Sequence, residues 1–167
     1  MITGLFVVLT VVAALGSGLI AGVFFAFSAF VMTALGRRPP DQGIAAMQSI
    51  NITVINPWFF AAFFGTAAIC VALVIVSFFR WSEPGTIYAL AGSVLYLVGA
   101  ILVTVLFNVP LNDALAAAEP GSAEGAGLWT RYLAEWTAWN HVRTAAPLAA
   151  AAAFILALMT ACAEQET

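Results

Sequence analysis

The sequence predicts an all-α membrane protein, a four-transmembrane-helix bundle with extended, partly kinked helices. Of its 167 residues 63% are hydrophobic and only 8% are charged, whereas the apolar share of a soluble domain is about 45–50%. No charged side chain falls between positions 1 and 36, between 44 and 79, or between 144 and 163. Each stretch supplies the roughly 20 residues that a bilayer core requires. We expect one membrane domain that covers residues 1–167.

The first predicted span, residues 2–35, is longer than a perpendicular crossing needs, so it should tilt or project into one interface. Gly18 and Gly22 form a GxxxG pair, which lets a neighbouring backbone approach closely. We expect this pair to pack inside the bundle. A seam between two copies of the chain, which would make a homo-oligomer, is the alternative. Residues 36–43 have the composition of a turn.

The second predicted span, residues 44–79, is interrupted at Asn56 and Pro57. Proline removes an internal hydrogen bond and biases the residue before it away from the helical conformation. The sequence therefore predicts a kink or a helix start at this point. The short turn that follows, residues 80–85, leads into the third span.

The third predicted span, residues 86–107, ends in a polar stretch broken by Pro110 at the membrane edge. Residues 114–127 are more polar and have the composition of a short interfacial helix. The last helix is expected to begin near Leu128 and to continue through Ala163, with a bend at Pro147.

Four spans place both termini on one side of the bilayer. Four of the five arginines belong to the opposite side, which the positive-inside rule makes cytoplasmic; they are Arg37, Arg38, Arg131 and Arg143. We therefore expect a multi-pass protein of the cell membrane whose main partner is the lipid bilayer. A net charge of −3 with no lysine offers no basic patch, so nucleic acid is not an expected partner.

Three groups of polar side chains are predicted to converge on the same membrane face and to form a pocket for a hydrophobic small molecule. The groups are Gln48, Asn51 and Asn56; Asn108, Asn112 and Asp113; and Trp136, Asn140, His141 and Arg143. Polar and ionisable groups near hydrocarbon are costly unless they face the bundle interior and find partners. Such groups therefore indicate a functional site.

Helical spacing predicts that one face of the last helix carries an aromatic wall, an amide and a guanidinium. The residues are Trp129, Tyr132, Trp136, Asn140 and Arg143. His141 lies about 100° round from Asn140. Two plainer interpretations stay open: the rings could be an interfacial aromatic belt, and Arg143 could form a structural ion pair with Asp113.

His141 is the only histidine, which excludes sites that need several histidine ligands. An enzyme with this composition would work by proton transfer in a dry pocket. Histidine ionises near neutral pH, so His141 and Asp113 are the candidate acid–base groups on this face.

Four segments resemble the DUF1772, or anthrone oxygenase-like, family of small membrane proteins. They are GSGLIAGVFFAFSAFVMTAL, NITVINPWF, NVPLNDAL and WTRYLAEWTAWNHVRT. The resemblance implies a four-helix membrane bundle. For some fungal members it also implies oxidation of anthrones to anthraquinones with no recognised metal or flavin, so no cofactor is expected.

The family's recurring polar positions correspond here to Asn51, Asn56, Asn108, Asn112, Trp136, Asn140 and Arg143. An anthrone is a weak carbon acid whose enolate reacts with oxygen. The aromatic side chains would bind its flat rings, His141 or Asp113 would accept the proton, and Asn140 with Arg143 would stabilise the enolate oxygen. The alternative is a non-enzymatic membrane protein that binds lipid or a small apolar ligand, or that serves as an accessory subunit.

Overall fold

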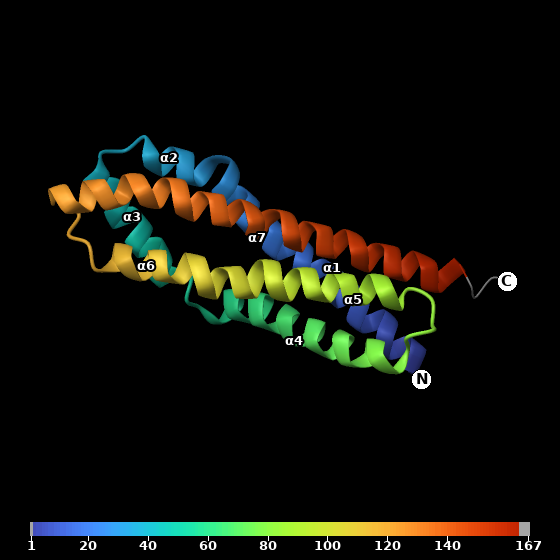
Figure 1. Ribbon diagram of the computed structural model, residues 1–167. Coiled ribbons are helices and arrows are strands. Elements are labelled where there is room, and N and C mark those ends of the chain that lie inside the picture. Colours follow the sequence, from blue (N-terminus) through green and yellow to red (C-terminus); the bar gives the residue numbers. More distant parts are fainter. Residues whose placement is uncertain (1, 164–167) are drawn as a thin grey trace.

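Four long helices run alongside one another in the computed structural model, which describes residues 2–163 (Figure 1). The first is continuous from α1 (Ile2–Ala26) through the π-helical segment η1 (Phe27–Val31) to α2 (Met32–Gly36). After the short α3 (Pro40–Thr53), the second long helix is α4 (Pro57–Phe79). The predicted four-helix, all-α class is confirmed for the described residues.

The third and fourth long helices complete the bundle. The third joins α5 (Thr86–Tyr96), the π-helical segments η2 (Leu97–Leu102) and η3 (Thr104–Asn108), and α6 (Val109–Ala116). The fourth is α7 (Ala123–Ala163). Both ends of the chain lie at the end of the bundle that also holds the α4–α5 turn (Figure 1), as the topology prediction required.

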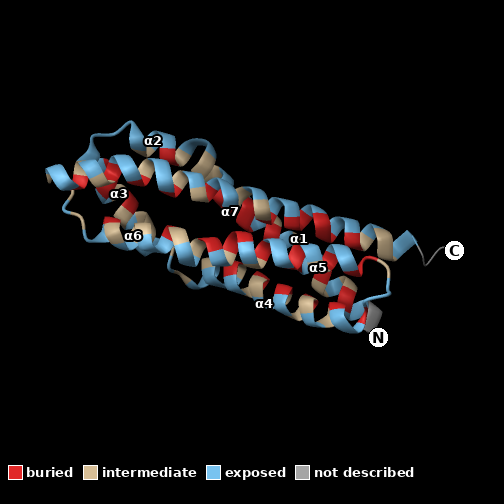
Figure 2. Ribbon diagram, viewed as in Figure 1, coloured by how far each residue is buried: buried red, intermediate tan, exposed pale blue. Residues whose placement is uncertain are grey.

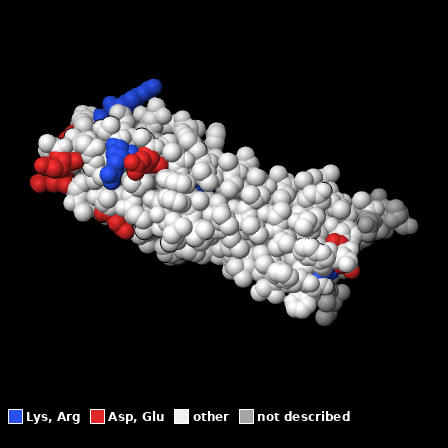
Figure 3. All heavy atoms as spheres, viewed as in Figure 1, with Lys and Arg blue, Asp and Glu red and all other residues white. Residues whose placement is uncertain are grey.

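The four long helices are long and apolar enough to cross a bilayer, so the protein is a multi-pass membrane protein. The 23 residues of α4 rise about 35 Å at 1.5 Å per residue, against a hydrocarbon core of about 30 Å. Exposed aromatic side chains mark both ends of α4, with Trp58 87% exposed and Phe79 86% exposed. Charged side chains gather at the two ends of the molecule and leave the visible middle uncharged (Figure 3).

The structure extends past the start of α4 into a helical cap, which consists of α2, α3, α6 and residues 123–136 of α7 (Figure 1). The cap has its own apolar core. Its buried members are Met32, Ile44, Met47, Leu115, Trp129, Tyr132 and Trp136. Gln48 joins α3 to the end of α6, because its side-chain amide nitrogen, Nε2, donates to the carbonyl oxygens of Leu115 (2.8 Å) and Ala118 (3.0 Å).

Asn56 determines where α4 begins. Its Oδ1 accepts hydrogen bonds from the backbone N–H groups of Trp58 (3.1 Å) and Phe59 (3.0 Å), as an N-cap residue does. Its Nδ2 donates to the Thr53 carbonyl at 3.0 Å. The sequence allowed either a kink or a helix start at Pro57. The structure shows a helix start there.

Two predicted boundaries are wrong. The third long helix does not end at Phe107 but continues through Pro110 to Ala116. Pro110 lies in the first turn of α6, directly after a π-helical segment that has already broken the α-helical hydrogen-bond register, so its missing N–H costs little. The last helix begins at Ala123 and not near Leu128, because the Ser122 hydroxyl accepts from the Gly125 N–H at 2.9 Å and caps the helix there.

Small residues bring α5 and its continuation against α7. A Cβ added to Gly85, Gly92 or Gly99 would collide with atoms of α7, at Ala157, Phe154 and Ala146 respectively. The GxxxG pair behaves differently. A Cβ at Gly18 or Gly22 would meet nothing within 4 Å, so the predicted packing of this pair inside the bundle is wrong, since both glycines face outward from α1. A seam between two copies stays a prediction.

The topology yields a labelling prediction. In a chain whose Cys70 and Cys162 are replaced by Ala, single cysteines at positions 37 and 131 should be accessible to a membrane-impermeant maleimide from the same side of the membrane. A cysteine at position 80 should react from the other side, because an odd number of spans separates it from both. The positive-inside rule makes position 80 the externally labelled one. External labelling of positions 37 and 80 alike would contradict the arrangement.

Candidate functional site

One face of α7 turns inward over its first half, as the spacing of its aromatic and polar residues predicted. Trp129, Tyr132, Trp136, Asn140 and Arg143 are all buried. Figure 2 shows buried positions recurring along α7 between exposed ones. The rings of Trp129 and Tyr132 stack at 5.6 Å and those of Tyr132 and Trp136 at 5.9 Å, measured between centroids. The rings therefore form an internal wall and not an interfacial belt.

Arg143 is the charged group at the inner end of this wall, and it is 4% exposed. Its Cζ lies 4.4 Å from the ring centroid of Phe24 and 4.8 Å from that of Trp136, which are cation–π distances. Nη2 donates to Asn140 Oδ1 at 2.9 Å, and Nη1 donates to Thr104 Oγ1 at 3.3 Å. Nε is buried and has no hydrogen-bond partner. Every polar partner of this guanidinium is uncharged.

The Asn140 side chain fixes the orientation of Arg143. Its Nδ2 donates to the Phe24 carbonyl at 2.7 Å and to Ser28 Oγ at 2.8 Å, so both amide protons are used on α1 and η1. The amide oxygen is left to face Arg143. Thr144 Oγ1 lies 3.2 Å from Ser28 Oγ and completes this contact between the first and last helices.

Two π-helical segments supply the polar partners from the neighbouring helices. Ser28 belongs to η1, whereas Thr104 and Asn108 belong to η3. A π-helical segment shifts the hydrogen-bond register of a helix and re-aims its side chains; such segments are rare and frequently occur at functional sites. Both helices that flank this part of α7 are locally deformed where they meet the cluster.

Asn108 and Asn112 contact the wall from the third long helix. Asn112 Oδ1 accepts hydrogen bonds from Tyr132 Oη and Trp136 Nε1, each at 2.8 Å. Asn108 is fully buried, and its Nδ2 donates to the Trp136 carbonyl at 3.2 Å. Its Oδ1 has no partner. The Asn51 side chain of α3 also faces the Tyr132 hydroxyl. The predicted convergence holds for these side chains of α3, η3, α6 and α7. Together with the residues around Arg143 they form what we call the arginine cluster: Phe24, Ser28, Asn51, Thr104, Asn108, Asn112, Tyr132, Trp136, Asn140 and Arg143.

Four predicted members lie outside the arginine cluster, and one of them, Gln48, bonds within the cap. Asp113 is exposed, and the ion pair that it was expected to form with Arg143 is not among the ion pairs of residues 2–163. Asn112 takes the inward position on α6, which turns the neighbouring Asp113 away. His141 is also exposed, on the far side of α7. Asn56 uses its side chain to cap α4.

The sequence analysis missed Phe24, Ser28 and Thr104. Ser28 and Thr104 carried a signal, because each is a hydroxyl side chain inside an apolar run, where polar groups usually face a partner in the bundle. Phe24 carried none, since it is one of 13 phenylalanines in the chain. Only the packing of α1 against α7 distinguishes it from the others.

The arginine cluster lies at the cap end of the four apolar helices. Asn108 contacts the same part of α7 as the cap core, and Asn140 bonds to the Phe24 carbonyl near the end of α1. Thr104, which receives the hydrogen bond from Arg143, is four residues before Asn108 and so about 6 Å deeper. At the same depth, the Phe24 ring contacts that of Phe63 in α4 edge to face at 6.2 Å.

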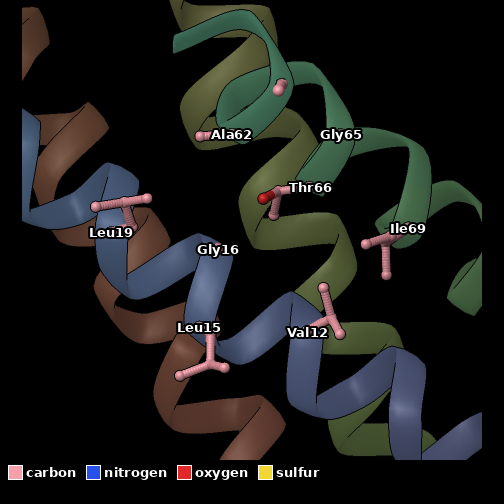
Figure 4. A pocket seen from close by; sticks show the side chains of 9 residues that line it. Val12, Leu15, Gly16, Leu19, Ala62, Gly65, Thr66 and Ile69 are labelled. Carbon is pink, nitrogen blue, oxygen red and sulfur yellow. The ribbon is translucent and has the colours of Figure 1, made fainter. Parts of the chain in front are cut away.

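Two cavities flank the bundle, and Arg143 lines neither. A groove of about 280 Å³ lies between α1 and α4, where Gly16, Ala62 and Gly65 leave space beside Thr66 (Figure 4). A second cavity of about 260 Å³ lies between α2 and α7 and includes Thr33 and Thr137.

The shared acceptor Asn112 gives a stability prediction. Asn112→Ala should leave the Tyr132 hydroxyl and the Trp136 N–H unpaired and should lower the free energy of unfolding by about 1–3 kcal/mol. Asp113→Ala, at the adjacent exposed position, is the matched control and should change it by no more than about 0.5 kcal/mol. Unfolding in detergent, followed by tryptophan fluorescence, measures both. Equal destabilisation by the two variants would contradict the role given to Asn112.

Comparison with known proteins gives one family. The sequence profile described as anthrone oxygenase matches residues 58–153, from the start of α4 into the second half of α7. Neither curated proteins nor solved structures give a match. The matched region holds most of the arginine cluster, whereas Asn51, Phe24 and Ser28 precede it. Because the profile covers more than half of the chain, the chain belongs to the anthrone oxygenase (DUF1772) family.

Proposed function

We propose that the protein is a cofactor-independent membrane oxygenase that acts on a hydrophobic aromatic molecule, anthrone-like or quinone-like, at the arginine cluster. The observation that carries the proposal is the environment of Arg143, a buried guanidinium set against two aromatic rings with one donor, Nε, unpaired. Aromatic faces suit a flat ring system, and an unpaired cationic donor suits an oxygen on that ring.

The reaction replaces a ring methylene by a carbonyl. The methylene of an anthrone loses a proton, and the electron pair of the C–H bond is delocalised onto the carbonyl oxygen as an enolate. Molecular oxygen then bonds to the former methylene carbon and takes up electrons to form a peroxide. Loss of the second C–H proton and cleavage of the O–O bond release water and leave a carbonyl. Substrate and O₂ thus give quinone and water, with four electrons moved from carbon to oxygen.

The residues have separable roles in this scheme. Arg143 stabilises the enolate oxygen, because positive charge placed beforehand where negative charge develops is the largest single contribution in many enzymes. Asn140 is a positioning residue, since its amide protons are used on α1 and η1 and its oxygen holds Arg143. Trp136 and Phe24 contact the rings, and the unpaired Asn108 Oδ1 can accept from a ring hydroxyl.

A second function is favoured by the groove between α1 and α4. The groove is apolar apart from Thr66 (Figure 4), and its lining residues fall within positions 12–19 of α1 and 61–69 of α4, away from the ends of both helices. A protein that only binds a lipid chain or a small apolar molecule needs no more than this groove. In that case the arginine cluster would hold the helices together and would carry no chemistry.

Oxygen consumption separates the two functions. With the purified protein in lipid nanodiscs, anthrone should be converted to anthraquinone with one O₂ consumed per product, and with ¹⁸O₂ one labelled oxygen should enter the product. Arg143→Met should lower kcat/KM by about 10²–10³, the loss typical of one oxyanion donor. Arg80→Met is the matched control, a buried arginine against a ring at the opposite end of α4, and should not change it.

The background is the autoxidation of anthrone in nanodiscs without protein. Turnover no faster than this background would contradict the oxygenase proposal for anthrones. Equal activity of Arg143→Met and the unaltered protein would contradict the assignment of the reaction to the arginine cluster.

A further inference from the structure

We infer that the arginine cluster binds its ligand as a preformed organic anion, the enolate or phenolate of a flat aromatic molecule, and that the protein supplies the counter-cation but no base. The inference rests on the proposed function for the aromatic nature of the ligand. The ionisation state follows from the charges and hydrogen bonds around Arg143.

The first step concerns the uncompensated charge of Arg143. Residues 2–163 contain two ion pairs, Arg80 with Glu83 at 3.7 Å and Arg131 with Glu135 at 3.8 Å. Arg143 takes part in neither, and its partners Asn140 and Thr104 are neutral. A buried cation without an anion is costly, because neutral groups replace only part of the lost hydration. A bound anion would offset this cost.

The second step is a comparison with Arg80, which shares most features of Arg143. Arg80 is also buried, its Cζ lies 4.7 Å from the Phe6 ring centroid, and its Nε is also unpaired. At Arg80, however, the chain supplies Glu83. The two buried arginines therefore differ chiefly in whether an acid accompanies them. Arg143 is therefore the buried arginine at which an anion from outside the chain could take the place that Glu83 has beside Arg80.

The third step concerns the proton. The groups that surround Arg143 from α1, η1 and η3 are Phe24, Ser28, Thr104 and Asn108, and none of them ionises. Asn51 of α3 and Asn112 of α6 face Tyr132 and do not ionise either.

On α7 itself, Tyr132 is the titratable side chain that is buried on the same face as Arg143. Tyr132 already donates its hydroxyl proton to Asn112, so it is not placed to accept another. His141 and Asp113 are exposed elsewhere. The ligand proton therefore passes to water at the cap side before or during entry, and the guanidinium lowers the pKa of the bound acid.

The fourth step concerns the type of anion. Asn140 and Thr104 take one N–H each from Nη2 and Nη1, and Nε is the guanidinium nitrogen that has no partner. Three of the five N–H groups therefore remain for an anionic oxygen, and the neighbouring rings decide the type of anion. The rings of Phe24 and Trp136 against the guanidinium favour a delocalised, weakly hydrated anion over a small inorganic one.

The test uses a ring that cannot be oxidised at a methylene. 2-Hydroxyanthraquinone changes colour when its phenol ionises, and it is titrated with and without the protein in nanodiscs under argon. Binding should lower the apparent pKa of the probe by at least about one unit, which means that the anion binds at least tenfold more tightly than the neutral form. 2-Methoxyanthraquinone has the same ring system but cannot ionise, and it should bind at least tenfold more weakly.

The variants separate the contributions. Arg143→Met should abolish the shift, and Arg143→Lys should retain part of it and so show that the bundle tolerates a change at this position. Arg80→Met, His141→Ala and Asp113→Asn should retain the full shift. Loss of the shift in His141→Ala or Asp113→Asn would overturn the absence of a protein base. Loss in Arg80→Met, or equal binding of the two anthraquinones, would overturn the anion site.

Two further outcomes complete the test. Displacement of the probe by sodium chloride but not by sodium gluconate at equal ionic strength would identify an inorganic anion site and overturn the inference. A probe pKa shift without oxygen uptake from anthrone would support the anion site while the proposed oxygenase function fails. Oxygen uptake from anthrone without a preference for the anionic probe would support the oxygenase function and overturn the anion site.

Discussion

The burial of the Arg143 charge is the constraint on which the polar interior of this protein depends. A guanidinium buried within an apolar bundle must find its hydrogen-bond acceptors inside the bundle, because its own burial keeps it from water. The carbonyl oxygen of Phe24 and the hydroxyls of Ser28 and Thr104 are therefore drawn from three different helical segments toward α7. Arg143 and Asn140, the side chain that orients it, make the hydrogen bonds from α7 to these three groups.

The same constraint accounts for two of the irregular stretches of helix. A regular α-helix presents side chains at fixed angles of about 100° per residue, which limits what it can aim at a given point on a neighbour. The segments η1 and η3 break this periodicity next to the arginine cluster. Farther along the bundle, where α5 meets α7 through glycine and alanine, no polar target exists and close packing decides the geometry. The segment η2 is also π-helical but has no polar side chain, and it lies where Gly99 packs against Ala146, so polar contacts account for η1 and η3 only.

Sequence reasoning reached the features that one helix determines by itself. The inward face of α7 followed from residue spacing, and the start of α4 followed from Asn56 and Pro57, because periodicity and capping are local properties. The errors concern relations between helices. Asp113 was expected to pair with Arg143 because it is the nearest acid in sequence, but the rotation of α6 presents Asn112 instead. Gly18 and Gly22 have a packing motif, yet the side of α1 that carries them has no neighbour within the chain.

The proposed reaction has two requirements that are met together only near the end of a membrane span: access from hydrocarbon for the substrate and O₂, and access to water for the released proton. A hydrophobic aromatic molecule and O₂ both concentrate in hydrocarbon, whereas a proton released from the molecule needs water to receive it. Deep in the span the proton would have no acceptor, and in the cap the apolar molecule would have to leave the bilayer. At the cap end of the apolar helices, the rings of Phe24 and Phe63 continue the arginine cluster toward the hydrocarbon. On the other side, Asn112 and the partly exposed Asn51 continue it toward the cap and water. In the proposed function, a fixed cation at this level would hold the ionised form of a molecule that enters from one phase and gives its proton to the other.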